Sequence, residues 1–271
     1  MLTVCFTTAP YLPFLMKNVH HVSSCNFYRQ RQGKESVDTF VARKAAELDT
    51  KFQELGPETV IGFIAEPVVG AALGCVPYVP GYLRAMRNVC HKYGALFILD
   101  EVMCGMGRSG TLHAWQAEGV APDLQTVGKG LGGGYQPIAA VLISKKVVDA
   151  LSNGSGQFVH GQTYQGMPVQ AAAALEVRPF SRMYIFPFLD CLISLRLKSF
   201  NRSESLLTAN AQQVQKIVRE ENLCENVRIQ GAYLGKLLKE LLGHHPNVGD
   251  IRGKGLFWGY VATGLLFSFR L

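Results

Sequence analysis

Two residues of this chain can do chemistry together, a lysine and a carboxylate that lies 29 positions before it. Lys129 stands in the glycine-dense run 126–134, and Asp100 ends a short apolar run at 95–99. A lysine amine condenses with an aldehyde to form a Schiff base, and a carboxylate keeps a pyridine nitrogen protonated so that the ring accepts electrons. The pair therefore indicates covalent catalysis on a pyridine aldehyde.

Helices and short buried strands are expected to position this pair. Residues 37–55 and 81–93 combine charged and apolar residues at helical spacing, and Gly56-Pro57 and Gly94 end the two segments. Apolar runs of strand length follow at 60–65, 95–99, 123–127 and 138–143. This alternation predicts an α/β fold with a mostly parallel sheet that helices cover on both faces.

The chemistry is expected at one edge of that sheet. Glu66, Asp100 and Lys129 each fall at or just beyond the end of a predicted strand. In open α/β sheets, ligands bind at the carboxyl ends of the strands. The three side chains are therefore predicted to belong to one site.

The composition fits a globular chain with a sizeable core, and the charge distribution argues against a nucleic-acid partner. The 271 residues are 48% hydrophobic and 17% charged, with a formal net charge of +7. The basic excess lies in 1–34 and 178–213, outside the region that holds the motifs. No arrangement of bases with stacking aromatics is evident, so no nucleic acid is expected.

The cysteines and the apolar runs favour a cytoplasmic protein. The seven cysteines are an odd number without Cys-x-x-Cys spacing, which argues against a disulfide framework or a zinc site. The first 16 residues lack a basic start and contain Pro10 and Pro13, so no secretory signal is expected. The run 183–195 is too short to span a membrane, and no membrane partner is expected.

Residues 178–213 differ from their surroundings, because they are aromatic and basic and lack helical or strand periodicity. Joining Val177 directly to Gln215 would give a continuous amphipathic helix. One hypothesis is that this segment is a translated intron or a gene-annotation error. The alternative is a genuine surface insertion.

Five sequence blocks, in a fixed order, carry a resemblance to a known family. They lie at 64–70, 97–110, 126–134, 160–166 and 248–256. Together they resemble the blocks of the class III pyridoxal-phosphate-dependent aminotransferases, the omega-aminotransferase-like group. The resemblance implies transfer of an amino group from an amine or amino acid to an oxo acid, with pyridoxal 5'-phosphate as cofactor and a homodimer as the assembly.

The resemblance also implies a fold and its division. Residues 1–177 would form part of a type I pyridoxal-phosphate transferase large domain. Residues 178–213 would be the atypical insertion. Residues 214–271 would form a helix and the start of an α+β small domain. The family pattern usually begins earlier and ends later, so we expect an incomplete large domain and a truncated small domain.

Three residues would contact the cofactor in the same subunit. Lys129 would form the Schiff base and then carry a proton as general base, where the alternative is a surface lysine. Asp100 would pair with the pyridinium nitrogen, where the alternative is a helix cap. Val102 would pack against the cofactor ring, where the alternative is an ordinary core residue.

Two further residues match family positions with other roles. Thr163 resembles the threonine that reaches the cofactor phosphate of the neighbouring subunit, and the alternative is a turn residue. Glu66 resembles the glutamate that pairs with a substrate-gating arginine, and the alternative is a structural acid. No metal ligands are expected, because the histidines show no metal-binding spacing with acids or cysteines.

The sequence departs from the family pattern in two ways. Met103 stands where many members have a glutamine that bonds the cofactor's phenolic oxygen, and a thioether cannot donate that bond. The family's phosphate-cradling turn and ring-stacking aromatic residue have no equivalent here. We therefore expect weak or no cofactor retention by the chain alone.

Two alternatives belong to other function classes. Glycines at 105, 107 and 110, and again at 128, 130 and 133, satisfy the dinucleotide fingerprint, but neither set opens a strand-turn-helix unit. The second alternative is a catalytically inactive fragment that serves as a binding module. Exposed apolar surface would mark such a fragment.

Overall fold

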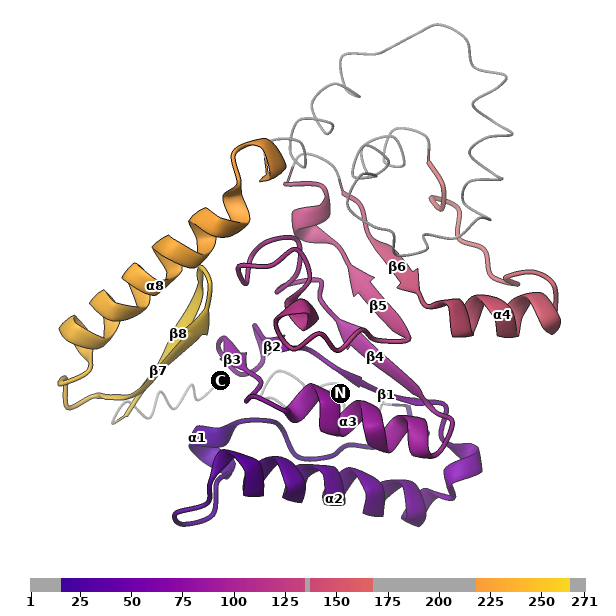
Figure 1. Cartoon of the computed structure of the whole chain (residues 1–271), viewed down its shortest axis with the longest axis horizontal. Coiled ribbons are helices and arrows are strands. Elements are labelled where there is room, and N and C mark those ends of the chain that lie inside the picture. Colours follow the sequence, from indigo (N-terminus) through magenta and orange to yellow (C-terminus); the bar gives the residue numbers. More distant parts are fainter. Residues whose placement is uncertain (1–15, 135–136, 168–217, 264–271) are drawn as a thin grey trace, which may run out of the picture.

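The computed structural model describes residues 16–134, 137–167 and 218–263. Its centre is a four-stranded sheet in the order β1-β4-β5-β6. Strands β1 (Gly62–Ala65), β4 (Leu96–Asp100) and β5 (Leu124–Val127) run parallel, and β6 (Ala140–Ile143) pairs antiparallel to β5 (Figure 1). The α/β class and the mostly parallel sheet are therefore confirmed.

The two long helices of the first half begin and end at the expected signals. Helix α2 (Val37–Leu55) is capped by Ser36, whose side chain accepts a hydrogen bond from the Thr39 N–H. It ends at Gly56, whose φ of +80° suits a residue without a side chain. Helix α3 (Tyr82–Lys92) ends just before Gly94, which has a φ of +70°.

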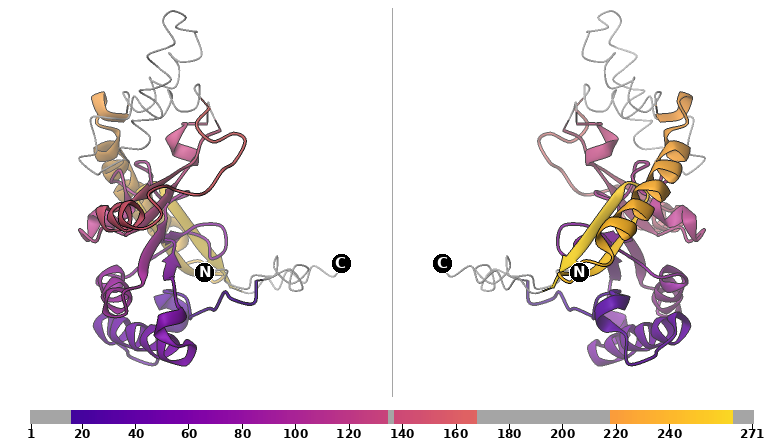
Figure 2. Two further views of the ribbon diagram at one scale, coloured as in Figure 1. Left: turned by 90° about the vertical axis from the view of Figure 1, so that its right-hand side faces the viewer. Right: turned by 90° about the vertical axis from the view of Figure 1, so that its left-hand side faces the viewer.

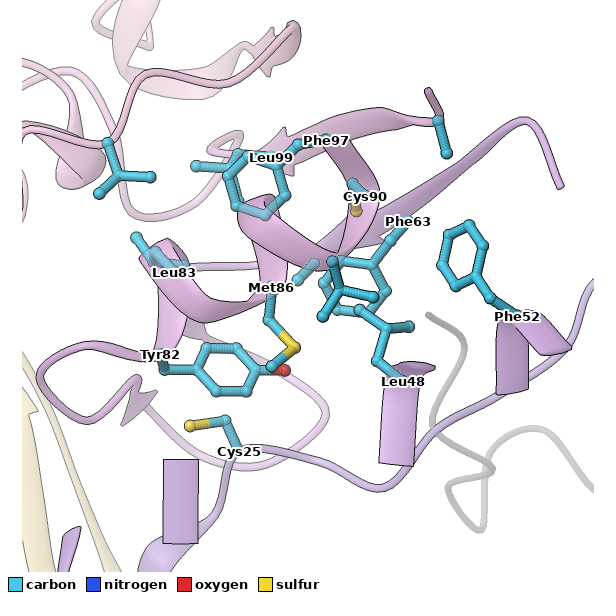
Figure 3. Packing of buried hydrophobic residues seen from close by; sticks show 14 of the residues in the cluster. Cys25, Leu48, Phe52, Phe63, Tyr82, Leu83, Met86, Cys90, Phe97 and Leu99 are labelled. Atoms are coloured by element: carbon cyan, nitrogen blue, oxygen red, sulfur yellow. The ribbon is translucent and has the colours of Figure 1, made fainter. Parts of the chain in front are cut away.

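The core lies between these helices and one face of the sheet. Helix α3 packs on the sheet and α2 packs on α3, so the two form successive layers on the same side (Figure 1). Alternate residues of β4, Phe97 and Leu99, are fully buried, and Figure 3 shows them beside Leu83 and Met86 of α3. This packing fixes which face of β4 the side chain of Asp100 leaves, because strand side chains alternate between faces.

Short elements connect the layers. They are α1 (Phe27–Gln30), η2 (Pro57–Thr59), β2 (Val68–Val69), β3 (Val76–Pro77), η3 (Ala114–Ala117), η4 (Lys129–Leu131) and α4 (Lys145–Asn153). Strands β2 and β3 pair antiparallel as a separate two-stranded ribbon. This ribbon brings the chain from the end of β1 back towards α3.

The C-terminal part is a helix that lies on a hairpin. Helix α8 (Leu223–Leu242) runs alongside β7 (Val248–Lys254) and β8 (Phe257–Ala262), which pair antiparallel (Figure 2). A Cβ at Gly235 would lie 2.3 Å from the Trp258 ring, so the missing side chain lets the helix approach.

Several expectations fall outside the described part of the chain. The insertion predicted at 178–213 and both of its boundaries lie in the stretch 168–217, which the structure does not describe. The domain division therefore stays a prediction. In the described part, no helix is long and apolar enough to cross a lipid bilayer.

Candidate active site

Asp100 ends β4 at the carboxyl edge of the sheet. Its Oδ1 atom accepts a hydrogen bond from the Val102 N–H at 3.0 Å, which folds the chain over the carboxylate. The residue is half-buried and is the register partner of Thr126 in β5. The carboxylate therefore faces the same side of the sheet as the Thr126 hydroxyl.

Lys129 follows β5 and opens the turn η4. Its φ of +43° is left-handed, a conformation that few residues other than glycine adopt. The side chain is exposed and borders an open cavity of about 630 Å³, whose other lining residues are Gly134, Pro137, Ile138 and Ala139. The amine is thus held at the mouth of a cavity by a strained backbone.

Glu66 follows β1, and its carboxyl interacts electrostatically with both Asp100 and Lys129. Burial raises the pKa of its carboxyl, and a hydrogen bond from the Gly70 N–H at 3.2 Å lowers it. The negative charge of Asp100 raises the pKa further, whereas the positive charge of Lys129 lowers it. The ends of β1, β4 and β5 thus place Glu66 within electrostatic reach of both Asp100 and Lys129.

Val102 lies beside the residue that precedes the lysine. A Cβ at Gly128 would be in ordinary contact, 3.5 Å from Val102 Cγ1 and 3.6 Å from the Ala139 Cβ. Gly128 therefore lies between Val102 and Ala139, the residue that precedes β6. The nearby Thr126 Oγ1 atom is buried without a hydrogen-bond partner.

Thr163 lies in the exposed stretch 152–167. Within the described ranges, no hydrogen bond or ion pair joins it to these four residues. The same stretch exposes the large apolar side chains Phe158, Val159 and Tyr164.

Met103 packs against the loop that follows Glu66. A Cβ at Gly70 would lie 2.6 Å from Met103 Sδ and 2.9 Å from Phe257 Cζ. The thioether therefore fills an apolar contact between the large sheet and the C-terminal hairpin. A side chain at position 70 would displace it.

Glu101 is a buried acid at this edge whose place the sequence did not reveal. It is fully buried, with Oε2 accepting from the Ala114 N–H at 2.7 Å and Oε1 from the Trp115 N–H at 3.0 Å. Burial raises the pKa of this carboxyl to about 7, against the opposing effect of the two backbone bonds. A signal existed, because the residue after Asp100 must face the opposite side of the sheet.

Gln125 is a second buried polar residue on that opposite side. It is a polar residue in the short strand β5, and only 1% of its surface is exposed. Its amide contacts His113 Nδ1 at 2.9 Å and accepts from the Trp115 indole N–H at 3.1 Å. Burial lowers the pKa of His113 to about 4, so the imidazole is neutral at pH 7.

A comparison with known protein families shows which family this chain resembles. The family model described as aminotransferase class-III matches residues 1–178. The chain belongs to the class III aminotransferase family. Members of this family work with pyridoxal phosphate, and the carboxyl edge that holds Lys129 and Asp100 lies within the matched residues.

Curated class III relatives extend along most of the chain. It is 51% identical to an aminotransferase of Gibberella zeae over 244 residues, which cover 90% of this chain and 40% of the relative. It is 36% identical to a putrescine–pyruvate aminotransferase of Pseudomonas aeruginosa, again over 244 residues, which cover 90% of this chain and 44% of that enzyme. The chain thus spans less than half the length of these two relatives.

Solved structures of transaminases share the fold. A thermostable (S)-enantioselective omega-transaminase from Thermomicrobium roseum matches with a TM-score of 0.74 and 33% identity, covering 95% of this chain and 49% of that chain. An omega-transaminase from Pseudomonas jessenii in complex with PMP matches with a TM-score of 0.70 and 33% identity, covering 90% and 46% of the two chains. The described residues therefore include part of the large domain of a type I pyridoxal-phosphate-dependent transferase.

Proposed function

We propose that this chain carries the catalytic lysine of a pyridoxal-phosphate-dependent aminotransferase that moves an amino group from an amine or amino acid to an oxo acid. The observation that carries the proposal is the convergence of Lys129, Asp100 and Glu66 at one sheet edge in a class III family member. The names of relatives that act on putrescine and pyruvate, or on gamma-aminobutyrate, support an amine donor.

The groups on the chain fit the chemistry of the cofactor. When bound, pyridoxal phosphate supplies an aldehyde for an amine to attack and an aromatic ring that accepts electrons. The exposed Lys129 amine, which lines the cavity, would hold the cofactor through its aldehyde. Its Nζ atom would also serve as the base that moves a proton at the substrate carbon.

Asp100 and Val102 would orient the ring. The Asp100 carboxylate would hold a proton on the ring nitrogen, because one of its oxygens is already fixed by the Val102 N–H. The side chain of Val102, beside Gly128, would pack against one ring face. The unpartnered Thr126 hydroxyl adds a hydrogen-bonding group beside Asp100 on the same face.

Thr163 and Glu66 would act from outside the ring plane. The exposed position of Thr163, away from the Lys129 cavity, suits a hydroxyl that donates to the cofactor phosphate of a partner subunit in a homodimer. Glu66, half-buried beside Asp100, would pair with a substrate-gating arginine. The cytoplasm, where thiols stay reduced, suits the free cysteines found among the described residues.

An inactive fragment is the alternative function. It predicts that Lys129 is no more reactive than other exposed lysines. The site geometry favours the enzyme, because Glu66, whose carboxyl pKa is raised by burial, lies within electrostatic reach of Asp100 and Lys129, and such perturbed groups cluster at functional sites.

Borohydride trapping tests the proposal. The full chain is mixed with pyridoxal phosphate, reduced, digested and analysed by mass spectrometry. We expect preferential labelling of Lys129 and loss of that label in Lys129→Ala. Lys145→Gln is the matched control, because Lys145 is an exposed lysine that pairs with Asp149 on the surface helix α4. Equal labelling of Lys129, Lys145 and Lys146 would refute the proposal.

A further inference from the structure

The face of the sheet opposite the candidate site holds a buried polar cluster of Glu101, Gln125 and the turn 113–115, here called the bracket. Asp100 and Thr126 face the site, whereas the neighbouring residues Glu101 and Gln125 face the other way. Glu101 and Gln125 are fully or almost fully buried and come from two adjacent strand segments. Each stands directly beside a residue that faces the site, so any shift of the bracket moves the site.

One turn, residues 113–115, bonds to both strand segments. Glu101 accepts the Ala114 and Trp115 N–H groups, at 2.7 and 3.0 Å. Gln125 contacts His113 at 2.9 Å and accepts the Trp115 indole N–H at 3.1 Å. The His113 and Trp115 rings stack with their planes 9° apart. The turn therefore ties the end of β4 to β5 from behind.

The bracket ends where the main-chain ladder ends. The Glu101 N–H donates to the Thr126 carbonyl at 3.0 Å, which extends the β4–β5 pairing to its final bond. Beyond this bond β5 ends at Val127, and the chain turns at Gly128 into Lys129. Replacing the Glu101 carboxylate would leave at least one of the Ala114 and Trp115 N–H groups without its acceptor, which would loosen this last pairing.

We propose that Glu101 is a positioning residue: with Gln125 and the turn 113–115, it holds the ends of β4 and β5 together and so sets the spacing between Asp100 and Lys129. The inference rests on the proposed function for its catalytic meaning. Its structural content, a local clamp on the ends of two strands, stands without a cofactor.

Four titratable residues surround the bracket: Tyr78, Cys104, Glu118 and Lys254. Lys254 of β7 donates to the Tyr78 hydroxyl at 3.1 Å, and its positive charge lowers the pKa of Glu101. Glu101 in turn raises the pKa of the buried Cys104 thiol and of Tyr78. Glu118 also faces Tyr78 and Lys254, but its carboxylate accepts from the Gly81 N–H at 2.6 Å and bonds to neither β4 nor β5.

That difference makes Glu118→Gln the matched control for Glu101→Gln. Both substitutions keep the side-chain size and remove one carboxylate, but Glu101 accepts two N–H groups of the turn 113–115, whereas Glu118 accepts the Gly81 N–H that precedes α3. Amide hydrogen exchange is measured on the cofactor-free full chain. In Glu101→Gln we expect peptides that cover 124–130 to exchange about 10- to 100-fold faster, while peptides of α2 stay unchanged. In Glu118→Gln both regions should match the wild type.

Trapping of Lys129 with pyridoxal phosphate and borohydride supplies the second readout. We expect the pH at which half of Lys129 is trapped to move in Glu101→Gln and not in Glu118→Gln. If wild-type Lys129 is not trapped, the proposed function fails, and hydrogen exchange alone then decides the positioning inference. Unchanged exchange over 124–130 in Glu101→Gln overturns the inference, as does a uniform rise that includes α2.

A gentler variant keeps the inference testable if Glu101→Gln does not fold. Trp115→Phe removes the indole N–H that Gln125 accepts and makes the ring that stacks on His113 smaller, but it keeps the Trp115 backbone N–H that Glu101 accepts. We expect the same direction of change over 124–130, about 3- to 10-fold. Wild-type exchange in a folded Trp115→Phe chain would overturn the role of the bracket.

Discussion

Asp100 and Thr126 are direct partners in the parallel pair β4–β5, so their side chains leave the same face of the sheet at its carboxyl edge. The Asp100 carboxylate has one oxygen fixed by the Val102 N–H, whereas the Thr126 hydroxyl is buried without a partner. At this edge the sheet therefore presents the Asp100 carboxylate, held by one hydrogen bond, beside the unpartnered Thr126 hydroxyl.

Asp100→Asn isolates the charge of this pair. An asparagine oxygen still accepts the Val102 N–H, so the local turn should remain. Loss of a charge-assisted hydrogen bond to the cofactor should raise the Kd for pyridoxal phosphate about 10- to 150-fold. Spectral titration measures the Kd, with Asp149→Asn on exposed α4 as control. An unchanged Kd for Asp100→Asn would remove this carboxylate from the site.

The buried bracket predicts a specific pH dependence of stability. Burial raises the Glu101 pKa from 4.5 to about 7. Between these values the folded chain keeps a proton that the unfolded chain releases, so this contribution is lost as pH rises to 7. Burial lowers the His113 pKa from 6.5 to about 4, so the imidazole contributes stability that grows as pH rises from 4 to 6.5. The two trends oppose each other.

Glu101→Gln separates the two trends. Relative to wild type, its unfolding free energy should increase by roughly 2–3 kcal/mol between pH 4.5 and 7, because the variant has no carboxyl to ionise. Urea unfolding at several pH values measures the difference. A constant offset between variant and wild type across this range would show that Glu101 titrates normally in the folded chain.

Phe97→Ala should destabilise the core. The ring is fully buried in the middle of β4 and stacks with Phe63, whose centroid is 6.5 Å away. Removing it should lower the unfolding free energy by about 3–5 kcal/mol, measured by urea unfolding. Val141→Ala in β6 is the control, since Val141 is 60% exposed and should change stability by about 0.5 kcal/mol or less. Equal effects of the two variants would contradict the observed packing of β4.

Gly235→Ala should weaken the contact between α8 and the hairpin. Alanine usually favours a helix interior by about 1 kcal/mol over glycine, but here the new Cβ would lie 2.3 Å from the Trp258 ring. The clash should outweigh the propensity and lower the Tm. Lys236→Ala, one position further on the exposed face, should leave the Tm almost unchanged. A raised Tm for Gly235→Ala would mean that α8 does not pack on Trp258.

Local sequence signals were enough for most elements of the described fold. Helix 37–55 was predicted to the residue, because its charged and apolar residues have helical spacing and Gly56-Pro57 ends it. The structure adds the capping serine Ser36. The strands β1, β4, β5 and β6 fall within or overlap the predicted apolar runs, since buried parallel strands need short unbroken apolar sequences. The family blocks identified class III, which the family match confirms.

The predicted site was only partly accessible to such reasoning. Glu66, Asp100 and Lys129 could be grouped because each follows an apolar strand, and the structure brings them together. The roles of these residues, of Val102 and of Thr163 remain proposals. Thr163 lies in an exposed loop, and the sequence around a loop residue does not show which partner its side chain contacts.

The sequence by itself determined the helices, the strands, the family and the lysine–carboxylate pair, because each depends on residue types at short spacing. Only the tertiary structure decided that β6 runs antiparallel, that Gly235 admits Trp258, and that Glu101 and Gln125 meet the turn 113–115. These contacts join residues from different elements. Which polar side chain is buried among which partners depends on strand register and facing, and these are set by packing of the whole sheet.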